Sequence, residues 1–204
     1  MNRAALFVLA VVSSLACKKP EARRPNPRTA AAGVELLTFG ADRSTIMATA
    51  VRTSGPQSGR FTVFRGDVEL NPDDIERTKV RVNIDPGSIV TQSGELNTFL
   101  KSAEFFDSSR FRASFQSTSI RRVDGADAAG ASTHIVTGDL TLHDQTRAIS
   151  FPATLRVLPT EATVTADFSI NRMDFGIRYV GPIGNMVRPD VAIHLDIRAP
   201  RARR

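Results

Sequence analysis

The sequence contains few of the residues on which most metal sites and catalytic sites depend. Cysteine occurs once, at Cys17, so neither an intramolecular disulfide nor a cysteine-based metal site can be built. The three histidines, His134, His143 and His194, are far apart in the sequence. Nucleophile elbows, Cys–His pairs and glycine-rich phosphate loops are also missing. We therefore predict no metal site, no catalytic residues and no enzymatic activity. If a metal were bound, His143 would be the best ligand of the three.

An apolar run long enough to cross a bilayer as a helix is missing as well. The apolar residues 4–12 follow Arg3 and precede small residues that lead to Cys17. This order is typical of a bacterial export signal, which we place over residues 1–16. The run is too short to span the bilayer in the mature protein.

Cys17 directly follows Leu15 and Ala16, and this segment resembles the lipobox of bacterial lipoproteins. The resemblance implies a diacylglycerol group on Cys17 and a membrane anchor, and Lys18 favours the outer membrane. The alternative is ordinary secretory cleavage beside an incidental cysteine. Residues 17–33 are rich in proline, arginine and alanine without apolar periodicity, so we predict an extended tether there. The expected location is the periplasm, on the outer membrane.

The positive charge lies mainly outside the predicted folded part. The chain carries a net charge of +6, but basic residues are concentrated in residues 18–33 and in a basic tail over residues 199–204. The intervening segment has slightly more acidic than basic residues. This distribution disfavours nucleic acid as a partner. The basic segments are either solvated charge or contacts with anionic lipid.

Residues 34–198 show the alternation of apolar and polar residues that is typical of half-buried strands. In residues 79–85, for example, Val80, Val82 and Ile84 alternate with polar side chains. Glycine and proline punctuate the segments, and residues 55–59 are predicted to form a loop. The pattern predicts an all-β domain, a single antiparallel barrel of about eight strands.

One segment departs from the strand pattern. Leu96, Phe99, Leu100 and Ala103 fall on one face of a helix, so a short helix is predicted near residues 95–104. A helix of this length is marginal in water and must pack against the sheet.

Five segments, in order, resemble the YceI-like family of lipocalin-fold, polyisoprenoid-binding exported proteins. They are FTVFRGDV at residues 61–68, LKSAEFFD at 100–107, FQST at 115–118, VTGDLTLH at 136–143 and INRMDFGI at 170–177. The resemblance covers most of the predicted domain. It implies an extended lipocalin-like barrel whose interior is an apolar tunnel for an isoprenoid, such as a polyprenyl or quinone-type lipid, or for a similar amphiphile. It also implies that a homodimer can form.

The alternation and the resemblance together nominate apolar residues that face the interior. These residues would line the tunnel or, in the alternative of a packed structural or stress-response lipoprotein, fill the core: Phe61, Val68, Val82, Leu100, Phe105, Phe106, Phe111, Phe115, Leu140, Phe151, Phe168, Phe175 and Ile193. Burial of each CH₂ of a lipid tail would contribute about 0.8 kcal/mol to binding.

Asn171, Arg172 and Asp174 form the densest polar cluster in the sequence. One interpretation is an Arg172–Asp174 ion pair that fastens the last strands at the barrel rim. The other is that Arg172 contacts the head group of a bound lipid. Apart from such a lipid, no cofactor is expected.

Overall fold

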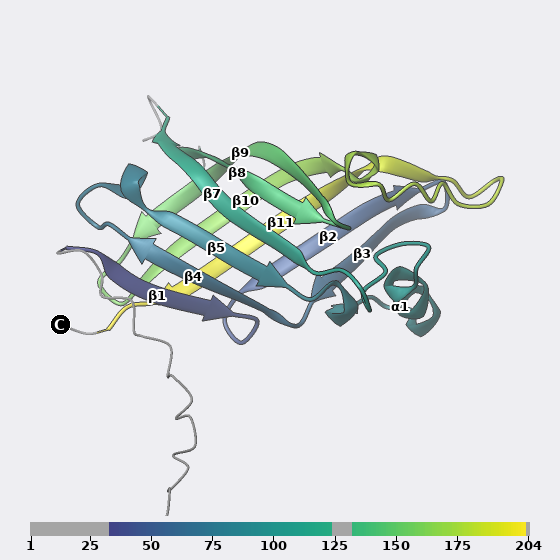
Figure 1. Cartoon of the computed structure of the whole chain (residues 1–204), viewed down its shortest axis with the longest axis horizontal. Coiled ribbons are helices and arrows are strands. Elements are labelled where there is room, and N and C mark those ends of the chain that lie inside the picture. Colours follow the sequence, from purple (N-terminus) through teal and green to yellow (C-terminus); the bar gives the residue numbers. More distant parts are fainter. Residues whose placement is uncertain (1–32, 124–131, 203–204) are drawn as a thin grey trace, which may run out of the picture.

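The computed structural model describes residues 33–123 and 132–202. The predicted export signal, Cys17 and nearly all of the tether lie outside the described residues. Eleven strands, one α-helix and three 3-10 helices make up the fold (Figure 1). The strands are β1 Glu35–Gly40, β2 Thr45–Arg52, β3 Gly55–Phe61, β4 Phe64–Leu70, β5 Lys79–Ile84, β6 Ile89–Val90, β7 Ala113–Arg122, β8 His134–Leu142, β9 Gln145–Val157, β10 Glu161–Asn171 and β11 Val187–Pro200. The helices are α1 Gly94–Lys101, η1 Ile75–Arg77, η2 Pro86–Ser88 and η3 Arg172–Phe175.

The strands form one antiparallel sheet in the order β1-β4-β5-β7-β8-β9-β10-β11-β2-β3-β6. Most neighbours in the sheet are also close in sequence, and short turns connect β2 to β3, β8 to β9 and β9 to β10. Between β8 and β9 the turn residues His143 and Asp144 have φ angles of 51° and 62°. Positive φ at both central residues is the geometry that matches a two-residue turn to the twist of the strands. The predicted all-β barrel class is confirmed.

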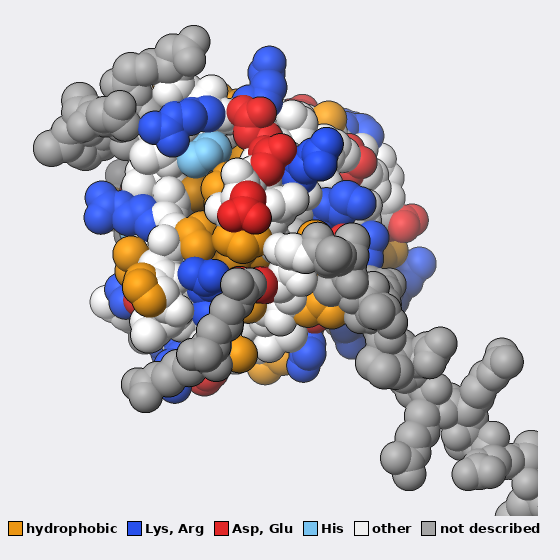
Figure 2. All heavy atoms as spheres, turned by 90° about the vertical axis from the view of Figure 1, so that its left-hand side faces the viewer, with side chains coloured by type: hydrophobic (Ala, Val, Ile, Leu, Met, Phe, Trp, Pro, Cys, Tyr) orange, Lys and Arg blue, Asp and Glu red, His pale blue; other side chains and the backbone are white. Residues whose placement is uncertain are grey.

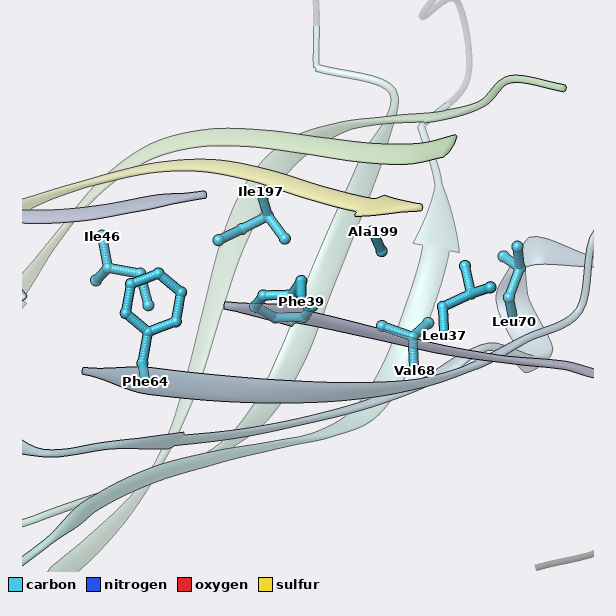
Figure 3. Close-up of a cluster of buried hydrophobic side chains, with 8 residues drawn as sticks. All are labelled: Leu37, Phe39, Ile46, Phe64, Val68, Leu70, Ile197 and Ala199. Carbon is cyan, nitrogen blue, oxygen red and sulfur yellow. The ribbon is translucent and has the colours of Figure 1, made fainter. Parts of the chain in front are cut away.

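The sheet curls until β1 lies near β11. Phe39 of β1 and Ile197 of β11 belong to the same apolar cluster, together with Phe64 of β4 (Figure 3). Arg201, just beyond β11, forms an ion pair with Glu35 at the start of β1, with Nη2 2.7 Å from Oε1. Side-chain packing and this ion pair thus connect β1 with the C-terminal part of β11.

Residue alternation explains which side of each strand faces inward. In β4, Phe64, Gly66, Val68 and Leu70 are buried, whereas the residues between them are more exposed. Gly66 is required by close packing, since a Cβ there would overlap the ring of Phe39. The alternation in β4 therefore places its apolar residues in the core and its polar residues on the outer face of the sheet.

The structure has eleven strands against the predicted eight or so, and two of them, β3 and β6, do not show the expected pattern. The segment predicted as a loop at residues 55–59 belongs to β3. Pro56 is tolerated because this part of β3 pairs only with β2, and proline is compatible with the open side of a strand. The second strand is β6, which has two residues and shows no periodicity.

The predicted helix exists but is shorter than expected. Helix α1 begins after Ser93, whose side-chain oxygen accepts a hydrogen bond from the Leu96 N–H at 3.2 Å. It ends at Lys101, and the Ser102 hydroxyl then donates to the Phe99 carbonyl at 2.7 Å. The chain turns at Asp107, which has a φ of 42°. Within the described residues, no helix has both the length and the hydrophobicity needed to cross a membrane.

Candidate binding cavity

The interior of the barrel is hollow along much of its length. A cavity of about 660 Å³ is lined by side chains from strands around the whole sheet and by α1. Most lining residues are aliphatic or aromatic. This volume lies in the range of small-molecule and lipid pockets, and the apolar wall is suited to a hydrocarbon chain.

Eleven of the thirteen predicted interior residues line this cavity. They are Phe61, Val68, Val82, Leu100, Phe105, Phe106, Phe115, Leu140, Phe151, Phe168 and Ile193. Eight of the eleven lie on strands, where the alternation of apolar and polar residues places every second side chain on the inner face. Leu100, Phe105 and Phe106 line the cavity from α1 and the segment after it. That these residues contact a ligand stays a prediction.

Phe111 and Phe175 do not line the cavity, so their predicted placement is corrected. The strand after α1 begins at Ala113, and the Phe111 ring instead lies against His143, with 4.8 Å between ring centroids. Phe175 belongs to η3 and is 1% exposed, packed outside the cavity wall. Strand periodicity did not apply to either residue, because each lies outside the strands.

Aromatic rings along the wall form two groups. In the middle of the barrel, Phe151 stacks on Phe168 with 4.1 Å between centroids, and Phe115 is 5.9 Å from Phe151. Near α1, the Phe105 and Phe106 rings meet edge to face at 4.9 Å. These contacts hold the rings against one another and leave the centre of the barrel open.

Arg172 borders the cavity, but its guanidinium is committed to the backbone. The residue is 2% exposed. Its Nη1 donates to the Ile177 carbonyl at 2.6 Å, Nη2 to Val187 at 3.1 Å and Nε to Arg188 at 3.2 Å. Burial lowers the pKa of Arg172. These bonds tie η3 to the start of β11.

The predicted Arg172–Asp174 ion pair is wrong. Asp174 is exposed, and no ion pair among residues 33–123 and 132–202 joins the two side chains. The backbone carbonyls satisfy Arg172 in its place. A contact between Arg172 and a lipid head group stays a prediction.

The two ends of the cavity differ in charge. One end, here called the η1 end, is bordered by Asp73, Asp74 and Glu76 and by Arg122 and Arg156. Figure 2 looks onto this end and shows apolar side chains near the centre of the face, with acidic side chains beside them and basic ones around. The opposite end, here called the α1 end, has α1 and η3 beside it.

Apart from Arg172, the polar residues of the wall were not predicted from the sequence, and His134 and Arg52 are two of them. His134 lies at the η1 end, is 5% exposed, and has its Nδ1 2.8 Å from the Thr133 hydroxyl oxygen. Burial is the main cause that lowers the pKa of His134; Arg122 lowers it further and Glu76 opposes both. Arg52 lies at the α1 end, on the inner face of β2. The alternation of β2 was the signal that could have identified Arg52.

The described residues hold no group of three or more His, Cys, Asp or Glu side chains placed to bind a metal ion. His194 faces outward, where its Nδ1 is 2.7 Å from Oδ1 of Asp167. His143 occupies the β8–β9 turn.

A curled antiparallel sheet around a long apolar cavity defines the class of lipocalin-like barrels. Within that class the chain belongs to the YceI-like family, since the family model for the YceI-like domain matches residues 37–199. The predicted family is thus confirmed.

Individual relatives agree with this assignment. A UPF0312 protein of Pseudomonas fluorescens is 33% identical over 138 residues, which cover 64% of this chain and 69% of that protein. UPF0312 proteins of Vibrio cholerae are 38% identical over 92 residues, so the chain spans about half the length of these relatives, 46%.

Solved structures share the fold at low sequence identity. BcnA of Burkholderia cenocepacia is similar with a TM-score of 0.67 at 21% identity, over 78% of this chain and 98% of that one. A polyisoprenoid binding domain from Saccharophagus degradans, implicated in plant cell wall breakdown, is similar with a TM-score of 0.60 at 17% identity, over 83% and 99% of the two chains.

Proposed function

We propose that this protein binds a long-chain isoprenoid or a similar amphiphilic lipid inside the barrel, as a carrier, storage or protective protein of the bacterial envelope. The observation that carries the proposal is the apolar cavity of about 660 Å³. A barrel packed solid, the alternative from the sequence, would have no such cavity.

The energetics of the wall favour a hydrocarbon tail. Each buried CH₂ contributes about 0.8 kcal/mol, so one five-carbon isoprene unit contributes about 4 kcal/mol before the costs of binding. A long tail can therefore bind with few polar contacts. The Saccharophagus domain with this fold is named for polyisoprenoid binding, which supports the same class of ligand here.

Export and anchoring complete the proposal. A lipid group on Cys17 and the tether of residues 17–33 would hold the barrel near the outer membrane on the periplasmic side. The bound lipid would then be exchanged with a membrane close by. These features rest on the sequence alone.

The test is native mass spectrometry of the full chain, expressed with export in a bacterial host and followed by organic extraction. We expect a bound lipid with a long isoprenoid-like tail. Phe168→Asp should abolish binding, because it places a charge on the cavity wall, whereas Ser169→Asp on the outer face of β10 should retain it.

Circular dichroism must show that both variants keep the barrel. An empty protein that also fails to take up added ubiquinone and polyprenyl lipids would overturn the proposal and favour a structural envelope lipoprotein.

A further inference from the structure

The inner face of β2 changes character along the strand. Ile46, Ala48, Ala50 and Arg52 are every second residue and all line the cavity. The two alanines have small side chains that leave space inside the cavity, and the row of inward-facing residues then ends in the cation of Arg52. Arg52 is thus directed by strand alternation toward the same cavity as the apolar residues before it.

Arg52 has an unsatisfied donor. Its Nε is buried and lacks a hydrogen-bond partner among the described residues, and none of their ion pairs includes Arg52. Arg172, also on the cavity wall, donates from all three of its nitrogens to carbonyls. The Arg52 guanidinium, which lines the cavity, therefore keeps donors for an acceptor from outside the chain, whereas the donors of Arg172 are already committed to carbonyls.

The strand registers place Arg52 far from the acidic end of the cavity. Arg52 pairs with Val187 at the start of β11, whereas Ala199 at the other end of β11 pairs with Ala162 near the start of β10. The acidic lining residues are all at the η1 end, on the connection that contains η1. Arg122 and Arg156 also line the η1 end, so two basic side chains accompany the three acidic ones there, whereas no acidic side chain of the described residues lines the cavity beside Arg52. An electron-rich head group is therefore favoured at Arg52.

We propose that Arg52 holds the oxygen-bearing head group of the bound lipid, with the tail extending from there toward the η1 end. The inference rests on the proposed function and deepens it. Each candidate head group carries an acceptor oxygen, in a quinone carbonyl, an alcohol or a phosphate, to which the guanidinium of Arg52 would donate an N–H. Arg52 remains partly exposed, so a head group there can stay in contact with water while the tail is buried.

The test compares three probes on the full chain: undecaprenyl phosphate, ubiquinone and squalene, which has no oxygen. Arg52→Met keeps the length and removes the donors. We expect it to weaken binding of the phosphate and the quinone by roughly tenfold and to leave squalene binding unchanged. Arg60→Met is the matched control, because Arg60 is exposed on β3 and does not line the cavity; it should change none of the three affinities.

Arg52→Lys separates charge from hydrogen bonding. It keeps the positive charge without the planar guanidinium donors, so it should retain more affinity for the phosphate than for the quinone. A larger loss for the phosphate than for the quinone in Arg52→Met identifies an anionic head group as the preferred source of the oxygen.

Two outcomes would overturn the inference while leaving the proposed function intact. One is equal affinity of Arg52→Met and the wild type for all three probes. The other is an equal loss for squalene, which would mean that Arg52 shapes the wall rather than binds oxygen. If the wild type binds none of the probes, the proposed function itself is wrong.

The orientation has its own readout. Undecaprenyl phosphate that carries a photoreactive group near the phosphate should crosslink to peptides that contain β2 or β3 in the wild type. Crosslinks to residues 73–76 would reverse the proposed direction of the lipid.

Discussion

Arg172 shows how one buried cation can organise the end of a barrel. It is the largest of the fully buried side chains, and its three bonds connect η3, the chain after it and β11. A planar guanidinium spreads its donors over three nitrogens, whereas an ammonium group has all of its donors on one nitrogen.

We expect Arg172→Lys to lower the free energy of unfolding by about 3 kcal/mol, because at least one buried carbonyl would lose its partner. Urea unfolding measures the change. Arg178→Lys, at an exposed position of the following loop, should change the free energy by less than about 0.5 kcal/mol. Equal stabilities of the two variants would contradict the role assigned to Arg172.

His134 makes stability depend on pH. Its pKa is lowered in the folded protein, mainly by burial, so the unfolded chain binds the proton more tightly. Neutral His134 therefore makes its full contribution to the free energy of unfolding above the pKa of histidine in the unfolded chain, about 6.5. This contribution is lost as the pH falls through that value toward the lower pKa of His134 in the folded protein.

We expect the free energy of unfolding to decrease between about pH 7.5 and about pH 5, and His134→Gln to decrease less over the same interval. Urea unfolding at a series of pH values gives both curves. Parallel curves for the wild type and His134→Gln would show that other groups cause the dependence.

At the scale of elements, the contact between β1 and β4 depends on a residue without a side chain. Phe39 of β1 crosses over Gly66 of β4, and these two residues are directly paired in the sheet. The Phe39 ring can join the cluster with Ile197 only because Gly66 leaves room for it (Figure 3).

Gly66→Ala should therefore destabilise the protein by about 1–3 kcal/mol, since the ring must move out of its place. Gly94→Ala is the control: apart from its chain neighbours and the backbone of its own helix, no heavy atom of the described residues lies within 4 Å of the added Cβ, so stability should change little or rise. Thermal unfolding of both variants decides the point, and a neutral Gly66→Ala would mean that β1 adapts easily.

The elements also show where periodicity succeeds. Strands with one apolar face toward the interior, such as β4, β5 and β8, were predicted from alternation, because such a strand must alternate. β3 was mistaken for a loop since Gly55 and Pro56 are usual turn residues, and only its pairing with β2 makes it a strand.

At the scale of the whole molecule, the proposed anchor would place the barrel beside the membrane that holds its proposed lipid ligand. Cys17 and residues 1–32 lie outside the described residues, so the anchor stays a proposal. The tether would let the barrel reach a membrane while remaining outside it.

We expect Cys17→Ser to move the exported protein from the membrane fraction to the soluble fraction, because the lipid attachment site is lost. Fractionation followed by mass spectrometry of the N-terminal peptide measures this, and the wild-type peptide should carry a diacylglyceryl group. A wild-type protein that is soluble and unmodified would indicate ordinary secretory cleavage.

The sequence by itself determined the fold class, the family and most of the cavity wall, because strand alternation separates inner from outer residues and the family segments are local. Only the tertiary structure decided that the barrel is hollow, since filling depends on how rings from distant strands, such as Phe151 and Phe168, meet. It also decided the roles of the two arginines. Arg172 is satisfied by carbonyls that become its neighbours only when η3 and β11 come together, whereas Arg52 borders the same cavity with its Nε unpaired.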